Sequence, residues 1–338
     1  KKGRIVSEKP ALHGMTELTL SNGVKVYFKK TDYQKDAVVM NFFGEGGSSL
    51  YPDKDVLDTK FISTAVKEGG VGRFSSTELN KVFSDKTVRI NAGVGIETQS
   101  ISGSSSLKDV RTLFELTYLY FTHLRRDDQA FNAELNRMRS FLTNREASPN
   151  VSYNDSIASI VYGNSPRVQP VKASSIDKVS YDRVLQIYKE RFSNASNFKM
   201  IIMGNIELSQ LQPLLEQYIA SLPATGKKES FVKSYPDVRN CNETHRFEKQ
   251  MKTPLARVSI FYTWDEPYTA KADLALDVFK RVLSIAYTDS VREEKGGVYG
   301  VKLQESLEQS SNPHALLKIA FDTDPDKYDV VMPIITGH

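Results

Sequence analysis

The chain has 338 residues, of which 40% are apolar and 25% are charged, and its formal net charge is +4. This composition is that of folded globular protein, and the length is sufficient for two domains with separate cores. The net charge is small, and the lysines are spread along the chain rather than gathered in one stripe. The sequence therefore does not indicate a nucleic-acid partner.

Cysteine usage and hydropathy bear on disulfides, structural zinc sites and membrane spans. Cys241 is the only cysteine, so the chain cannot form an internal disulfide, and no Cys/His cluster indicates a structural zinc site. No apolar run approaches the roughly eighteen residues of a membrane span, and Lys1–Pro10 lacks the apolar stretch of a secretion signal. The pattern predicts a soluble chain and leaves its compartment open between the bacterial periplasm and the cytoplasm.

The first part of the chain has the pattern of a sheet with covering helices. Residues 16–20 and 24–30 alternate in polarity on either side of Ser21-Asn22-Gly23, a strong hairpin signal. Apolar spacing then predicts strands over 37–43, 88–94, 97–103 and 198–203, the last without alternation, and helices over 53–68, 75–83, 107–122, 127–146, 180–192 and 207–219, with a weaker helical signal at 157–161.

A proline- and lysine-containing linker over 223–240 precedes a second series of elements. Strands are predicted over 243–250, 256–263, 298–307 and 315–321, with helices over 270–290 and from Pro325 onward. This order resembles that of residues 14–122, as expected for two copies of one α+β unit. We predict a first domain over 1–222, a linker over 223–240 and a second, incomplete domain over 241–338. Because a sheet without its covering helices exposes apolar strand faces, we expect further residues beyond His338.

The stretch with the clearest chemical content is Val291–Val301, which reads V-R-E-E-K-G-G-V-Y-G-V. Arg292 is predicted in the last turn of a helix, Gly296 and Gly297 supply the turn, and Tyr299 begins a strand. A guanidinium and a neutral phenol are hydrogen-bond donors that suit a carbonyl or a developing oxyanion. The same residues also have structural explanations, because helix C-termini favour cations and strands favour tyrosine. Spacing alone does not distinguish a chemical role for Arg292 and Tyr299 from a structural one.

The run R-E-E-K-G-G-V-Y-G-V resembles the arginine/tyrosine motif in the C-terminal half of the pitrilysin/insulinase family, zinc peptidases with an inverted H-x-x-E-H motif. The phrases L-S-N-G-V-K-V-Y and F-F-G-E-G-G-S-S resemble the opening of a family half. The resemblance implies an α+β metallopeptidase-like sandwich of two related, mainly antiparallel sheets covered by helices. It also implies that Arg292 and Tyr299 act as catalytic and substrate-binding residues beside a metal held by the other half.

The zinc motif itself is absent from the place where the resemblance would put it. Residues 58–64 read D-T-K-F-I-S-T, without histidine or glutamate. The histidines are too scattered for a local two-histidine motif, at positions 13, 123, 245, 314 and 338. We therefore expect this chain to bind no metal, with the zinc in a partner catalytic half.

Two functions from different classes remain open at this point. The favoured one is the C-terminal, zinc-free half of a bacterial-type zinc metalloendopeptidase, which lends Arg292 and Tyr299 to a catalytic half in the same or another polypeptide for hydrolysis of peptides. The alternative is a non-catalytic peptide-binding or assembly subunit with a peptidase-like fold, in which the Arg/Tyr pair only packs. A third hypothesis, an independent zinc enzyme with ligands distant in sequence, predicts stoichiometric zinc in the purified chain.

Overall fold

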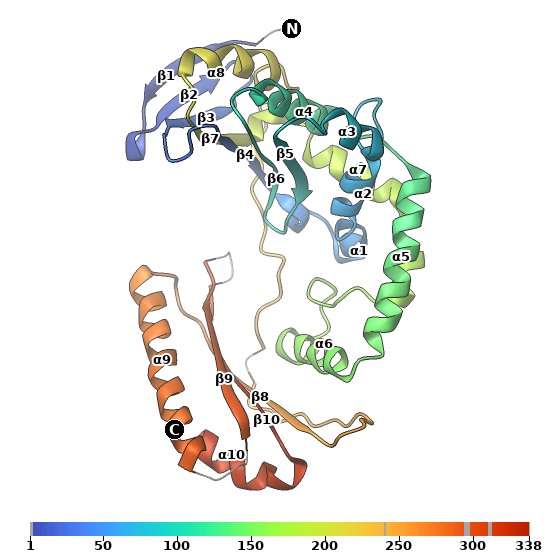
Figure 1. The fold of residues 1–338 in the computed structure, drawn as a ribbon, viewed down its shortest axis with the longest axis vertical. Helices are drawn as coiled ribbons and strands as arrows, with labels where there is room; N and C mark the ends of the chain where they lie inside the picture. Colours follow the sequence, from blue (N-terminus) through green and yellow to red (C-terminus); the bar gives the residue numbers. More distant parts are fainter. Residues whose placement is uncertain (1–2, 240, 294–297, 310–312, 338) are drawn as a thin grey trace. The chain divides into compact units, whose positions relative to one another are not determined.

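The computed structural model describes residues 3–239, 241–293, 298–309 and 313–337. Contacts divide the chain into two compact units (Figure 1). Unit 1 comprises Lys1–Arg145 and Pro170–Ser234, and unit 2 comprises Glu146–Gln169 and Tyr235–His338. Each unit has its own sheet, helices and apolar core.

Unit 1 is built on a seven-stranded sheet in the order β1-β2-β3-β7-β4-β6-β5. All neighbouring strands are antiparallel except β3 and β7, which are parallel. The strands are β1 (Ile5–Pro10), β2 (Thr16–Leu20), β3 (Lys25–Lys30), β4 (Val38–Glu45), β5 (Val88–Val94), β6 (Thr98–Ser105) and β7 (Phe198–Gly204).

Helices cover this sheet, with α4 packed on β5 and β6 and α8 beside the strands of the same unit (Figure 1). The α-helices are α1 (Val56–Thr59), α2 (Ile62–Gly69), α3 (Ser76–Val82), α4 (Val110–Thr122), α5 (Asp128–Glu146), α7 (Tyr181–Arg191) and α8 (Leu208–Leu214), the last continuing as a π-helical turn over Leu215–Ile219. Short 3₁₀ turns cover Leu12–Gly14, Gly47–Leu50, Asp53–Asp55, Ala173–Lys178 and Ala195–Asn197.

The core of unit 1 lies where alternating strand residues meet helix side chains. Val38, Met40 and Phe42 of β4 are buried, as the period of two requires for one covered face. The Phe42 ring lies 4.8 Å from that of Phe198 on β7, which lies 5.2 Å from Phe121 of α4. These aromatic contacts join two central strands to a helix and fix which face of the sheet is buried.

Unit 2 has a three-stranded antiparallel sheet in the order β8-β10-β9. Its core is a cluster of Tyr287, Ile319, Phe321, Val331 and Ile335. The elements are α6 (Pro149–Tyr162), β8 (Ala256–Trp264), α9 (Ala270–Glu293), β9 (Val298–Leu307), β10 (Ala315–Thr323), a 3₁₀ turn (Pro325–Lys327) and α10 (Tyr328–Thr336).

The two sheets contain one shared pattern. In unit 1, β4 is followed by helices and then by β5, β6 and α4, with the strands paired as β4-β6-β5. In unit 2, β8 is followed by α9, β9, β10 and α10, with the strands paired as β8-β10-β9. The predicted fold class, α+β with two related and mainly antiparallel sheets covered by helices, is confirmed.

Three predicted elements differ from the structure. Residues 243–250 do not form a strand; they are exposed and have no ladder partner among the residues that the structure describes. The predicted helix over 53–68 is broken after Thr59, because the Lys60 and Phe61 N–H groups bond three residues back in a tightened turn. The predicted strand 198–203 forms but does alternate, with Phe198, Met200 and Ile202 buried and Lys199 exposed.

The grouping of residues 146–169 with unit 2 differs from the predicted first domain over 1–222. The Tyr153 hydroxyl donates to Ser259 Oγ (2.9 Å), and Arg257 donates to Asn150 Oδ1 (2.5 Å), which ties α6 to β8. The division of the chain into domains at a 223–240 linker stays a prediction about folding units. The contacts show only which segments pack together.

Candidate functional site

The predicted site residues lie on two adjoining elements of unit 2. Arg292 is in the last turn of α9, which ends at Glu293, and Tyr299 is the second residue of β9. Residues 294–297, which carry Gly296 and Gly297, lie outside the described residues, and so do the side chains of Arg292 and Tyr299. The helix-then-strand arrangement of the motif agrees with the prediction. The roles of the two side chains stay a prediction.

The strand that carries Tyr299 contains a β-bulge at that point. Val301 pairs with Phe321 and Val298 pairs with Thr323, so Tyr299 and Gly300 together stand opposite Asp322. Gly300 has a φ of +125°, a conformation that side-chain-bearing residues rarely adopt. Bulges change the direction of side chains along a strand and are frequent next to active sites. The motif therefore has a backbone irregularity at its tyrosine, which spacing in the sequence did not reveal.

Asp322, opposite the bulge, is held by a bidentate ion pair. Arg257 Nε lies 2.8 Å from Asp322 Oδ1, and Arg257 Nη2 lies 2.8 Å from Asp322 Oδ2. The hydrogen bonds from Arg257 are the largest cause that lowers the pKa of Asp322, and the charge of Lys302 adds to it. Asp322 is therefore ionised at neutral pH and paired with Arg257, so it is not a candidate general acid.

The place at which the resemblance would put a zinc motif is filled by a different network. The Asp55 carboxylate pairs with Arg183 Nη2 (2.6 Å), and Asp58 Oδ1 accepts the Ser180 N–H (2.8 Å). The turn at 60–61 also separates α1 from α2, so no ligand pair can stand one turn apart on a single helix across it. These residues do not fit a zinc ion: both carboxylates already bond α7 and its N-cap.

The described part of the chain outside this network is no richer in metal-ligating clusters. No group of three or more His, Cys, Asp or Glu side chains that could hold a metal is present in the part of the chain that the structure describes. Cys241 is exposed, and His314 is buried beside the end of β9. Within the described ranges, no helix has both the length and the apolar character needed to cross a bilayer.

The Tyr51 hydroxyl has a raised pKa. Burial is the main cause, and its hydrogen bond to Glu190 (2.7 Å) adds to it, which together raise the pKa to about 12. The guanidinium carbons of Arg183 and Arg191 lie 5.4 and 5.3 Å from the centre of the Tyr51 ring. This tyrosine stays neutral and joins the β4 turn to α7, so its environment is that of a packing residue.

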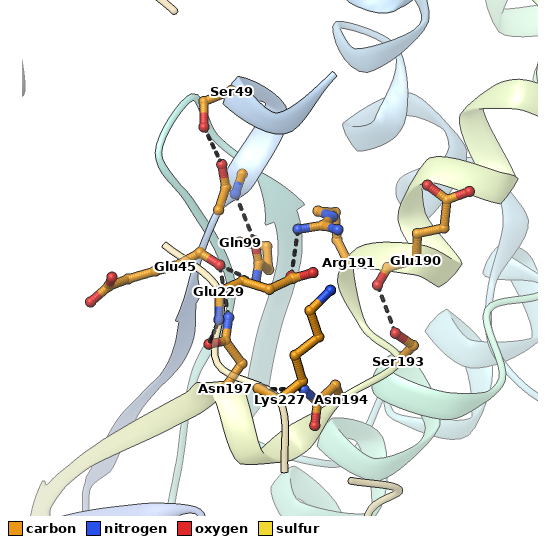
Figure 2. A network of polar contacts seen from close by, with 12 residues as sticks. Glu45, Ser49, Gln99, Glu190, Arg191, Ser193, Asn194, Asn197, Lys227 and Glu229 are labelled. Carbon is orange, nitrogen blue, oxygen red and sulfur yellow. Dashed lines mark hydrogen bonds and ion pairs between the residues drawn. The ribbon is translucent and has the colours of Figure 1, made fainter. Parts of the chain in front are cut away.

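A polar network that the sequence did not predict holds the start of the 223–240 segment against unit 1 (Figure 2). Residues 225–232, which we call the strap, bond to the 191–197 region and to the turn after β4. Glu229 pairs with Arg191 Nη1 (3.0 Å), the Glu229 N–H donates to Asn197 Oδ1 (2.9 Å), and the Val232 N–H donates to Ser49 Oγ (3.1 Å). Asn194 Nδ2 also donates to the Lys227 carbonyl oxygen (2.7 Å).

Residues 178–336 match the protein family described as the peptidase M16 inactive domain. The chain is 23% identical over 313 residues to the probable zinc protease PqqL of Haemophilus influenzae, which covers 93% of this chain and 33% of that protein. It is 27% identical over 231 residues to a zinc protease PQQL-like of Arabidopsis thaliana, covering 65% of this chain and 22% of that protein. The chain thus spans about a third or less of the length of these relatives.

Solved structures share the fold. The periplasmic protease PqqL from Escherichia coli matches with a TM-score of 0.84 at 20% identity, over 99% of this chain and 37% of that one. The first half of the same protease matches with a TM-score of 0.66 at 12% identity, over 96% and 71%. A peptidase M16 inactive domain from Pseudomonas fluorescens matches with a TM-score of 0.69 at 14% identity, over 95% and 77%.

The family match covers α7 onward and includes the whole Arg/Tyr motif, while the relatives extend the similarity over nearly the full chain. These findings agree with the predicted resemblance to the M16, or pitrilysin/insulinase-type, zinc peptidases, and residues 178–336 match the inactive domain of that family.

Proposed function

We propose that this chain is the zinc-free C-terminal half of a zinc metalloendopeptidase and works with a zinc-bearing catalytic half, in the same polypeptide or as a separate subunit. The observation that carries the proposal is the inactive-domain match over 178–336, which contains Arg292 and Tyr299. The zinc-incompatible network at Asp55 and Asp58 supports it, because a catalytic half would need that place for its ligands.

The two PqqL structures support assignment to the second half. The first half of PqqL fits this chain with a TM-score of 0.66, whereas the longer PqqL structure contains a region that fits with 0.84 and with higher identity. A better fit in the longer structure favours a match outside the first half. Of the two compartments that the sequence leaves open, the description of that neighbour as periplasmic favours the periplasm.

In this proposal Arg292 and Tyr299 are donors to a bound peptide. The Arg292 guanidinium donates charge-assisted hydrogen bonds to substrate backbone carbonyls, and the Tyr299 hydroxyl donates to the oxyanion that forms as the scissile carbonyl is attacked. Arginine and tyrosine side chains are ordinarily protonated at neutral pH, so neither residue is proposed as a base. The bulge opposite Asp322 supports this role for Tyr299, because it lets a strand residue leave the regular alternation.

The test is peptide cleavage by the chain reconstituted with its zinc-bearing half. Tyr299→Phe is expected to lower kcat at least tenfold with unchanged folding, since loss of one oxyanion donor raises the barrier by about 2–4 kcal/mol. Arg292→Lys is expected to lower kcat/KM at least tenfold, because lysine lacks the planar fork. Tyr268→Phe and Arg281→Lys, which alter an exposed tyrosine and an exposed α9 arginine of the same unit, serve as controls.

Wild-type kcat in Tyr299→Phe would refute the assigned role. The alternative, a peptide-binding or assembly subunit without turnover, is favoured by the description of the matched domain as inactive. It predicts that peptide binding persists while the zinc-bearing half restores no cleavage.

A further inference from the structure

The β-bulge beside Tyr299 lies level with an ion pair on the neighbouring strands. Asp322 of β10 is the cross-strand partner of Arg257 on β8, and Tyr299 and Gly300 of β9 stand opposite Asp322 on its other side. The bidentate pair between Arg257 and Asp322 therefore ties β8 to β10 at the level where β9 departs from regular pairing.

Alternation along the two strands puts this ion pair on the face of the sheet that points away from the core of unit 2. Val258 and Ile260 of β8 and Phe321 of β10 pack in the core cluster. Arg257 and Asp322 are the alternate residues, so they lie on the opposite face. About a third of each of these two side chains is exposed. Because the pair is bidentate and largely covered, it is more than a solvated surface contact.

Helix α6 holds the arginine of this pair. Arg257 also donates to Asn150 Oδ1 (2.5 Å), and its guanidinium carbon lies 5.9 Å from the centre of the Tyr153 ring. The Tyr153 hydroxyl in turn donates to Oγ of Ser259, the next residue of β8 on the same face (2.9 Å). Arg257 thus contacts β10 and α6 at once, and its planar group of donors is fixed between them.

The copy of the repeat without the Arg/Tyr motif lacks both the ion pair and the bulge. In unit 1 the corresponding set of paired residues is Val39 of β4, Ser104 of β6 and Arg89 of β5, in unbroken register. Both sets are the second from the same end of their ladders. A valine and a serine cannot form an ion pair. The charged tie and the bulge therefore occur together, in the copy that carries Tyr299.

We propose that Arg257 is a positioning residue: anchored by α6, it holds Asp322 in place and so fixes the bulge that sets the backbone of Tyr299. A bulge interrupts the ladder of its own strand, so β9 depends at this point on a neighbouring strand that stays in place. Loss of the pair releases β10 from β8 at this level. Arg257 acts on the reaction only through the Tyr299 hydroxyl, so this role rests on the proposed function.

The first measurement is hydrogen exchange of the β9 amides in the full 338-residue chain. Arg257→Gln should speed exchange over residues 299–303 about tenfold, because a charge-assisted pair beside them is lost. The matched control is Lys280→Gln, since Lys280 pairs with Glu305 of the same strand (2.6 Å), away from the bulge, and is also partly buried. It should leave these amides at the wild-type rate. Asn150→Ala, which removes one α6 contact of Arg257, should speed their exchange by a smaller factor.

The second measurement is peptide cleavage by the chain reconstituted with its zinc-bearing half. Arg257→Gln should lower kcat about fivefold or more and leave KM within about twofold, because the Tyr299 hydroxyl is proposed to donate only in the transition state. An effect that acts through Tyr299 is not additive with loss of that hydroxyl. In a Tyr299→Phe background, Arg257→Gln should therefore cost less than about twofold in kcat. General destabilisation of unit 2 would instead lower kcat by the same factor in both backgrounds.

Wild-type exchange and wild-type kcat in Arg257→Gln, together with a slow Tyr299→Phe, would overturn the positioning role and leave the proposed function standing. An equal loss of kcat from Arg257→Gln in both backgrounds would also overturn it, because the effect would then be structural and unconnected with Tyr299. Wild-type kcat in Tyr299→Phe would refute the proposed function, and the positioning role of Arg257 with it.

Discussion

Replacing Gly300 by alanine tests whether the bulge beside Tyr299 is enforced by the backbone. A Cβ at this position would meet no atom within 4 Å, so steric overlap with neighbours contributes nothing. The φ of +125° lies outside the regions that alanine adopts without strain, and holding such a residue there costs on the order of 1–3 kcal/mol. Gly300→Ala should therefore lower the unfolding free energy of unit 2 by about 1–3 kcal/mol.

The measurement is urea unfolding followed by the fluorescence of Trp264, which lies on β8 and so reports on unit 2. The control is Gly93→Ala in β5, the counterpart of β9 in the repeat. That Cβ also meets nothing within 4 Å, but Gly93 is not among the glycines with positive φ. Followed by circular dichroism, this variant should be unchanged or stabilised by about 0.4–1 kcal/mol. Equal stability of Gly300→Ala and wild type would refute the reasoning from backbone strain.

Two other predictions concern the strap and the Arg257–Asp322 pair. Arg191→Ala removes the strap's ion pair and the contact to Tyr51, so cleavage by a lysine-specific protease at Lys227 and Lys228 should accelerate about 10- to 100-fold, while cleavage at Lys233, beyond the strap, stays unchanged. An unchanged cleavage pattern would show that the strap is held without this pair. The lowered pKa of Asp322 stabilises unit 2 above the unfolded-state pKa near 4, and this stability is lost as the pH falls through the folded-state pKa. Asp322→Asn should flatten the pH dependence of unit 2 unfolding as the pH falls below about 4, and a slope equal to wild type would contradict the assignment.

Local patterns predicted most elements because they are determined by neighbours in sequence. The Ser75 side chain and Glu78 form the expected capping box of α3, and Asn22-Gly23 turns the β2–β3 hairpin. Hydrophobic spacing likewise located β4, α4, α7 and α9 to within a few residues. Each of these signals is complete within about ten residues.

Features that depend on distant partners were not predictable in this way. The strand expected over 243–250 needs a neighbour on β8, and none lies there in the described residues. The sequence predicts β7 without alternation, although Lys199 and Met203 on it are exposed, Met203 to 38%. The strap joins residues about thirty positions apart through asparagine side chains, which carry no periodic signal.

The proposed role of Arg292 and Tyr299 would assign chemistry to one copy of the repeated scaffold only. In unit 1 the junction between the helices and β5 reads F-S-D-K-T over 83–87, and the side chains there serve local structure: Asp109 accepts the Thr87 N–H and lies near Lys86. In unit 2 the corresponding junction carries Arg292 and Tyr299, and a bulge that β5 lacks in its continuous register with β6. Because β4, β6 and β5 have the same order and pairing as β8, β10 and β9, the difference cannot come from this shared part of the scaffold. Gly300 at the bulge has a positive φ, a conformation that other residues adopt only with strain. We therefore expect activity assays, rather than stability alone, to be the measurement that separates the two copies.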